Sequence, residues 1–116
     1  MTTETDTREI DRQIALEVMG FDPVLLVDEP TEIDTRIGRV LVAPFDAYST
    51  DIAAAWQVVE RMRELGWWRF ELTTSPEIAV AYFSEGAFVS GTGRSALTAP
   101  LAICKAALEA TKEQSA

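Results

Sequence analysis

The sequence predicts an α+β fold in which an antiparallel-rich sheet of three to four strands is sandwiched by three helices. Two observations support this: apolar residues recur at helical spacing in three segments, and short β-favouring runs between them end at proline or polar turns. The predicted order is α-β-β-α-β-β-α, with short turns that favour antiparallel neighbours. A chain of 116 residues has the length of one domain. We therefore expect a single domain over residues 1–116, with frayed tails at about 1–6 and 112–116.

The first predicted helix starts near Asp6, where a carboxylate lies three residues before Glu9, as in a capping box. Apolar residues then recur every four positions and mark one buried face. Gly20 ends the helix, because glycine readily adopts the left-handed conformation that follows a last helical turn.

Two strands are predicted next. Residues 24–27 form an unbroken apolar run that is typical of a short buried strand, and Pro30 follows it closely. We interpret residues 31–35 as a polar turn and residues 36–42 as the second strand, which is rich in β-favouring side chains. Within that strand, Gly38 indicates a bulge or a close backbone approach.

The central predicted helix lies within residues 48–66, and both of its ends can be read. Ser49 or Thr50 supplies the N-cap oxygen, and Asp51 lies in the first turn, where the helix dipole favours an anion. Apolar side chains follow at helical spacing, and Gly66 provides the left-handed residue after the last turn.

The second half of the chain predicts a hairpin and a last helix. Residues 67–73 and 77–84 alternate between two faces, so they are expected to pair as antiparallel strands. Residues 85–97 are a connection rich in glycine, serine and threonine. The last helix begins at about Thr98, with Pro100 in its first turn, where a missing N–H has no cost.

Composition excludes several kinds of chemistry. The sequence contains no histidine, which removes Ser-His-Asp and Cys-His catalysis and histidine metal ligands. The single cysteine, Cys104, excludes an intrachain disulfide and a cysteine-rich zinc site, and its apolar neighbours indicate a small buried side chain. We therefore expect a non-enzymatic protein with no catalytic residues, no cofactor and no metal.

The net charge of −9 repels duplex nucleic acid and anionic lipid at long range. No segment reaches the ~18 consecutive apolar residues of a membrane span, and the N-terminus has no apolar signal core. We expect neither duplex nucleic acid nor a membrane as a partner, and a cytoplasmic location.

The best candidate site is the loop Gly91-Thr92-Gly93-Arg94-Ser95. Glycines let a backbone approach a ligand closely, and N–H groups near a helix start attract phosphate. Arg94 adds a planar guanidinium that suits phosphate oxygens, and the surrounding residues include no acid. The alternative is an ordinary flexible connection between a strand and a helix. A Walker motif is excluded because its lysine and its spacing are missing.

Two aromatic side chains, Trp67 and Tyr48, are the predicted stacking partners for a ligand. Trp68 is expected in the core, whereas Trp67 shares a face with charged residues and is therefore expected to be exposed. The alternative for aromatic residues at strand or helical spacing is a place in the core, and an exposed Trp67 would contact a ligand or another subunit. Tyr48 lies at the start of the central helix, where capping is the alternative role of the surrounding polar residues.

Three phrases resemble the phage ABA sandwich family: Val18-Met19-Gly20, Ser49 to Trp56, and Thr98 to Leu108. They occur in order at sensible separations, so the resemblance extends from the first helix onward. It implies a phage or prophage origin, and the cytoplasm expected above is then that of the infected bacterial host. The family supplies no agreed catalytic residues. Some small phage α/β proteins sequester nucleotide signals of bacterial immunity, and the resemblance suggests that role.

Two functions follow as expectations. The first is a phage-encoded binding protein that sequesters a small anionic ligand, such as a nucleotide immune signal, as a counter-defence. Formation of a homo-oligomer is compatible with it, because a subunit seam would deepen the shallow pocket of a 116-residue chain. The alternative is an accessory phage protein that contacts another polypeptide through its acidic surface.

Overall fold

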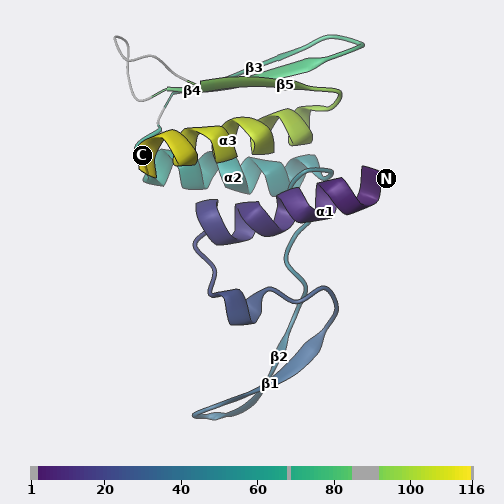
Figure 1. Ribbon diagram of the computed structural model, residues 1–116, viewed down its shortest axis with the longest axis vertical. Coiled ribbons are helices and arrows are strands. Elements are labelled where there is room, and N and C mark those ends of the chain that lie inside the picture. The colour runs from purple at the N-terminus through teal and green to yellow at the C-terminus, as the bar shows by residue number, and fades with distance from the viewer. Residues whose placement is uncertain (1–2, 68, 85–91, 116) are drawn as a thin grey trace.

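The structure is a computed structural model that describes residues 3–67, 69–84 and 92–115 (Figure 1). In chain order its elements are α1 (Thr3–Gln13), the π-helical segment η1 (Ile14–Val18), the 3₁₀ turn η2 (Pro23–Leu25), β1 (Thr31–Thr35), β2 (Gly38–Val42), α2 (Ile52–Glu64), β3 (Arg69–Thr74), β4 (Ala79–Ser84), β5 (Thr92–Ala96) and α3 (Ala99–Ser115). Helical structure thus extends into both predicted tails.

The described elements form layers (Figure 1). Strands β3, β4 and β5 make an antiparallel sheet in that order, and β1 and β2 form a separate antiparallel hairpin. Helices α2 and α3 lie together against one face of the three-stranded sheet, and α1 packs on the other side of these two helices. The predicted α+β class with antiparallel strands is confirmed. The structure adds one strand, β5, and its described helices lie on one side of the three-stranded sheet.

The core lies between α2, α3 and the inner face of the sheet, and it continues between these helices and η1. The predicted alternation of β4 side chains between two faces is confirmed. Ala79, Ala81 and Phe83, which share one face, are all buried. Phe70 lies opposite Phe83 in the register, and the two rings are 4.9 Å apart between centroids. Alanines on β4 and on α3 leave little side-chain bulk between helix and sheet, so the two backbones approach closely.

The end of α1 is wound more loosely than predicted. Helix α1 begins at Thr3 and continues into η1, where the N–H of Met19 donates to the carbonyl of Ile14 at 2.9 Å. That five-residue spacing defines a π-helical turn. Gly20 has a φ of +74° and ends the segment, as the sequence predicts.

The prediction of a strand at residues 24–27 is wrong. Asp22 accepts a hydrogen bond from the N–H of Val24 at 3.1 Å, and Pro23 occupies the first position, so the run begins as a 3₁₀ turn. The strand is instead β1, within the segment interpreted as a polar turn. Its side chains alternate but are mostly exposed, so they lack the apolar signal of a buried strand.

Gly38 is the first residue of β2 and does not form a close approach. Its φ is +123°, and a Cβ built there would meet no atom within 4 Å. The backbone conformation at this position therefore favours glycine. The position directly follows the two-residue turn between β1 and β2.

The N-cap of α2 is Asp51, whose carboxylate accepts from the N–H of Ala53 at 3.0 Å, and not Ser49 or Thr50. Ser49 is buried and joins α2 to α1 instead. Its N–H donates to Asp11 Oδ1 at 2.7 Å, and its hydroxyl donates to the carbonyl of Thr7 at 3.1 Å.

Candidate anion-binding groove

The predicted loop over residues 85–97 contains a strand. Residues 85–91, including the candidate Gly91, lie outside the described residues, and Thr92–Ala96 form β5 against β4. Glycine at position 93 suits this strand because a Cβ there would lie 3.2 Å from Cδ2 of the Tyr82 ring. The glycine therefore makes room for a neighbouring ring.

The alternation of β5 divides the predicted phosphate site between two faces of the sheet. Arg94 pairs in register with buried Ala81, on the face that α3 covers. Gly93 and Ser95 pair with Tyr82 and Val80, on the opposite face. Thr92 pairs with Phe83 at the start of the strand. The structure therefore does not bring Gly93, Arg94 and Ser95 around one point.

Arg94 contacts an acid that is distant in sequence. Its Nη2 lies 3.0 Å from Oε1 of Glu109 on α3, with side chains that are 49% and 30% exposed. The absence of acids near Arg94 in the sequence therefore does not leave its guanidinium without an acidic partner. Because both side chains reach solvent, the contact contributes little to stability and stays open to exchange.

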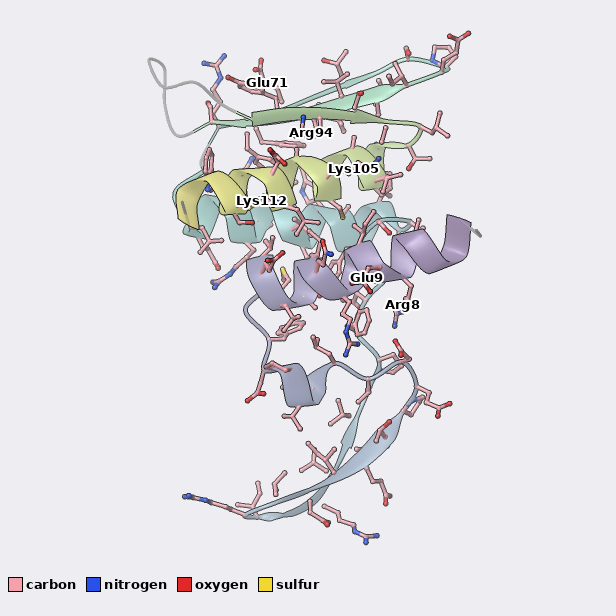
Figure 2. The ribbon with its side chains drawn as sticks, viewed as in Figure 1. Arg8, Glu9, Glu71, Arg94, Lys105 and Lys112 are labelled. Carbon is pink, nitrogen blue, oxygen red and sulfur yellow. The ribbon has the colours of Figure 1, made fainter. Side chains whose placement is uncertain are left out.

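Arg94 lies instead in a groove of about 260 Å³ between η1, β5 and α3, which we call the charged groove. Figure 2 shows Arg94, Lys105 and Lys112 gathered on this side of the molecule. The charged groove is lined by Gln13, Glu17, Arg94, Lys105, Leu108, Glu109 and Lys112.

Cations outnumber carboxylates in the charged groove. Arg94, Lys105 and Lys112 line it together with Glu17 and Glu109, whereas the chain as a whole carries a net charge of −9. Within the residues that the structure describes, neither lysine forms an ion pair. A local excess of positive charge with exposed lysine ammonium groups attracts an anion.

The two lysines are functional candidates that the sequence interpretation missed. Lys105 and Lys112 are seven residues apart, a spacing that puts two side chains on one face of a helix. Glu17 joins them only because η1 packs beside α3, and no spacing in the sequence indicates that contact.

The two predicted stacking side chains do not line the charged groove. Trp67 is 5% exposed and belongs to the core, so the prediction of an exposed ring is wrong. It is buried because the turn after α2 directs the chain back across the helix, where the Trp67 N–H donates to the carbonyl of Met62 at 2.9 Å. The expected core residue, Trp68, lies outside the described residues.

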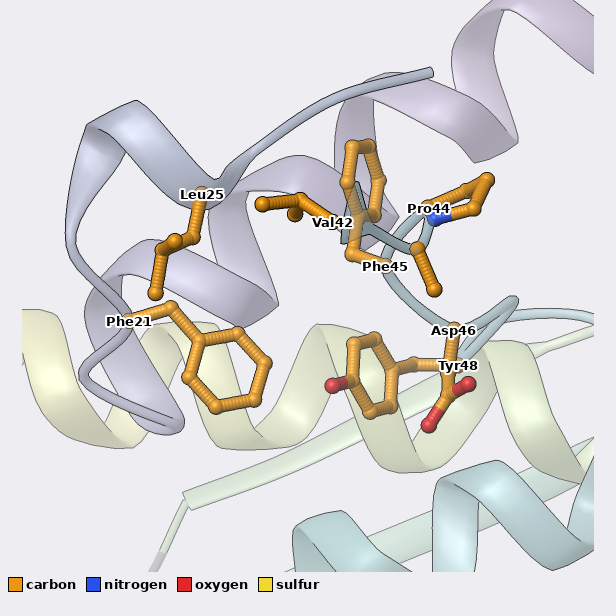
Figure 3. Close-up of a pocket in the computed structure, with 8 residues that line it drawn as sticks. Phe21, Leu25, Val42, Pro44, Phe45, Asp46 and Tyr48 are labelled. Atoms are coloured by element: carbon orange, nitrogen blue, oxygen red, sulfur yellow. The ribbon is translucent and has the colours of Figure 1, made fainter. Parts of the chain in front are cut away.

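Tyr48 is 1% exposed and lines a different cavity, which we call the apolar pocket (Figure 3). Burial, with smaller effects from nearby Asp46, Asp11 and Cys104, raises the pKa of Tyr48 to about 12. The apolar pocket has a volume of about 280 Å³ and lies between the helices and the base of the β1–β2 hairpin. Its lining residues are Phe21, Leu25, Val42, Ala43, Pro44, Phe45, Asp46 and Tyr48.

Cys104 is fully buried, as its neighbours predict. Burial, and to a smaller degree the charge of Asp11, raises the pKa of the thiol above its ordinary value. A buried thiol of raised pKa is a poor nucleophile. Within residues 3–67, 69–84 and 92–115, no three acidic or sulfur side chains converge as metal ligands do, and no helix is both long and apolar enough to cross a bilayer.

The similarity to known proteins covers nearly the whole chain. Residues 12–108 match the family described as the phage ABA sandwich domain. A crystal structure of a phage protein from Bacillus cereus ATCC 14579 is similar, with a TM-score of 0.64 and 28% sequence identity, over 96% of this chain and 96% of that chain. No curated protein matches. The resemblance indicated by the three sequence phrases is confirmed.

Proposed function

The chain belongs to the phage ABA sandwich domain family, and from that premise we propose that it is a non-enzymatic binding protein that captures a small anionic ligand in the charged groove. The observation that carries the proposal is the gathering of Arg94, Lys105 and Lys112 around one depression of a chain whose net charge is −9. Capture requires no bond chemistry, which suits a chain without histidine and with a buried thiol.

Arg94 can take part although Glu109 already contacts it. The contact with Glu109 is made through Nη2, and a guanidinium carries five N–H donors. The remaining donors can therefore bind a phosphate oxygen while Glu109 holds the side chain in place. The ammonium groups of Lys105 and Lys112 add point charges at the same groove.

The carboxylates of the groove favour a ligand with hydrogen-bond donors as well as negative charge. Glu17 and Glu109 would repel a bare anion, but both accept hydrogen bonds from hydroxyl or amino groups. A nucleotide carries phosphate together with sugar hydroxyls and base amino groups. A groove of about 260 Å³ is slightly smaller than the roughly 300–1,000 Å³ of typical ligand pockets, so it would hold a small ligand or one part of a nucleotide.

The biological role that we propose is sequestration of a nucleotide signal of bacterial immunity inside the infected cell. Its support is the phage setting of the family and the similarity to a phage protein from Bacillus cereus. Tight binding without turnover would lower the free concentration of such a signal.

Calorimetric titration of inorganic phosphate, nucleoside monophosphates and cyclic nucleotides tests the proposal. We expect a nucleotide to bind more tightly than phosphate and to be recovered intact after the protein is denatured. Arg94→Ala, Lys105→Ala and Lys112→Ala should each weaken binding by about tenfold, the effect of one charge-assisted hydrogen bond. These side chains are exposed, so the variants should remain folded.

The matched control is Arg63→Ala on α2, because Arg63 is 48% exposed, lies 3.9 Å from the carboxylate of Glu60 and does not line the charged groove. Its affinity should equal that of the wild type. A screen in which no anion binds would contradict capture and favour the alternative, contact with another polypeptide through the acidic surface. A ligand recovered in altered form would contradict the non-enzymatic part.

A further inference from the structure

The β1–β2 hairpin, residues 31–42, projects from the body of the molecule, and we call it the arm (Figure 1). Its strands are mostly exposed on both faces. The molecule is correspondingly extended, with a radius of gyration of 15.3 Å against roughly 13 Å for a compact chain of this length. An isolated two-stranded hairpin is marginally stable in water, so an arm of this kind gains most from a partner that covers it.

One face of the arm is apolar. In the register Ile33 lies opposite Val40 and shares its face with Val42. The other face carries Glu32, Asp34 and Arg39, which form ion pairs, together with Leu41. The tip carries Ile37, which is 93% exposed. Exposed apolar side chains that are this concentrated mark an interaction surface.

The base of the arm is held firmly on α1. The Arg8 guanidinium lies 3.7 Å from the centre of the Phe45 ring and donates to the Phe45 carbonyl, and its Nε lies 3.8 Å from Asp28. Arg12 donates to the carbonyl of Leu26. Arginines of α1 therefore contact the chain both before β1 and after β2.

The apolar pocket lies at this base and continues into the arm. Val42 lines the pocket and also belongs to the apolar face of the arm, next to Phe21 and Leu25, which are each 40% exposed (Figure 3). Asp46 lies at the same pocket and is exposed. The described residues offer it no ion-pair partner.

We propose that the arm binds the arm of a second copy of this chain. The two arms lie antiparallel about a two-fold axis, with their apolar faces packed against each other. In that arrangement each tip meets the base of the other arm whatever the arm's length. Ile37 of each copy enters the partner's apolar pocket, and Arg36 pairs with the partner's Asp46.

The two ends of the arm are complementary, which is why the occupant is a second copy. The tip presents an apolar side chain beside a cation, Arg36, which has no ion pair in the part of the chain that the structure describes. The base presents an apolar pocket beside an anion, Asp46. Because of the two-fold axis, the contact of Ile37 with the apolar pocket and the pairing of Arg36 with Asp46 each occur twice. Between these two ends, the apolar faces of the arms cover one another.

Sedimentation of the full chain over a micromolar concentration series tests this. The wild type should form a concentration-dependent dimer. Ile37→Glu should raise the dissociation constant at least about 100-fold, because the loss of apolar burial counts twice in a two-fold interface. Since Ile37 is 93% exposed, the variant should remain folded, which circular dichroism checks. Leu97→Glu, at an 82% exposed position between β5 and α3, is the matched control and should leave the dimer unchanged.

A mixing experiment tests the charge pair. Arg36→Glu and Asp46→Lys should each weaken the dimer, because each places like charges together. Their equimolar mixture should dimerise about tenfold more tightly than either variant alone, because both pairs are then opposite in sign. A monomeric wild type, a dimer that Ile37→Glu leaves intact, or a mixture without recovery would each overturn the proposal. These results are independent of anion binding, since no residue of the charged groove is changed.

Discussion

At the scale of single residues, burial and ion pairing determine which of the predicted site residues can contact a ligand. Tyr48 and Trp67 were candidates for stacking on a ligand, and both are buried. Arg94 was a candidate for an unpaired cation, and Glu109 contacts it at 3.0 Å. For Arg94 the partner that decides the outcome, Glu109, is distant in sequence.

Burial of Tyr48 predicts a loss of stability at alkaline pH. Its pKa is about 12 in the folded protein against 10.0 for an unperturbed phenol, so the fold favours the neutral form. The stabilisation is complete below pH 10 and is lost as the pH rises towards 12. We expect the free energy of unfolding, measured with urea, to fall by about 2–3 kcal/mol across this window because of Tyr48.

Tyr48→Phe is the control for that measurement, since it removes the titrating group and keeps the ring. Its free energy of unfolding should fall less steeply over the same pH range. Cys104, whose pKa is also raised, contributes a further alkaline loss that both proteins share. Identical pH profiles for the two proteins would contradict the assignment to Tyr48.

At the scale of elements, the glycines that end helices follow local rules more closely than strands do. The end of α2 is a Schellman motif, in which the N–H of Gly66 donates to Arg63 and that of Trp67 to Met62. Gly66 has a φ of +106°, as the sequence predicts for this position. By contrast, β1 and β5 are polar strands without an apolar alternation. They form because they pair with β2 and β4, and the spacing of apolar residues does not predict that pairing.

Gly66→Ala should lower the free energy of unfolding by about 1–2 kcal/mol, because an L side chain is strained in this conformation. No atom lies within 4 Å of a Cβ built there, so the cost is conformational and not steric. Urea denaturation gives the value. Gln57→Ala, at an exposed position inside α2, is the control and should change stability by less than about 0.5 kcal/mol. An equal effect of both changes would be inconsistent with a left-handed cap.

At the scale of the whole molecule, a buried polar contact joins the first helix to the start of α2. Asp11 is 2% exposed, accepts from the N–H of Ser49 at 2.7 Å, and lies 3.6 Å from Arg8. Arg8 in turn contacts Phe45 and Asp28 at the base of the arm. One connected set of side chains therefore positions α1, α2 and the arm relative to one another.

Asp11→Ala should lower the free energy of unfolding by about 1–3 kcal/mol, because it leaves the buried N–H of Ser49 without an acceptor. Asp11→Asn keeps an acceptor oxygen and should cost less. Urea denaturation of the two variants gives the comparison. If both substitutions cost the same, the charge of Asp11 and not its hydrogen bond would be the stabilising feature.

The sequence by itself determined the α+β class, the family, the helical period of α2, the alternation of β4 between two faces, and both glycines that end helices. These features depend on short-range periodicity and on backbone conformations that only glycine adopts readily. The tertiary structure alone decided that β5 pairs with β4, that Arg94 meets Glu109, and that Lys105 and Glu17 line one groove. The physical reason is that a site is made by side chains from different elements, and the packing of those elements depends on burial summed over the whole chain.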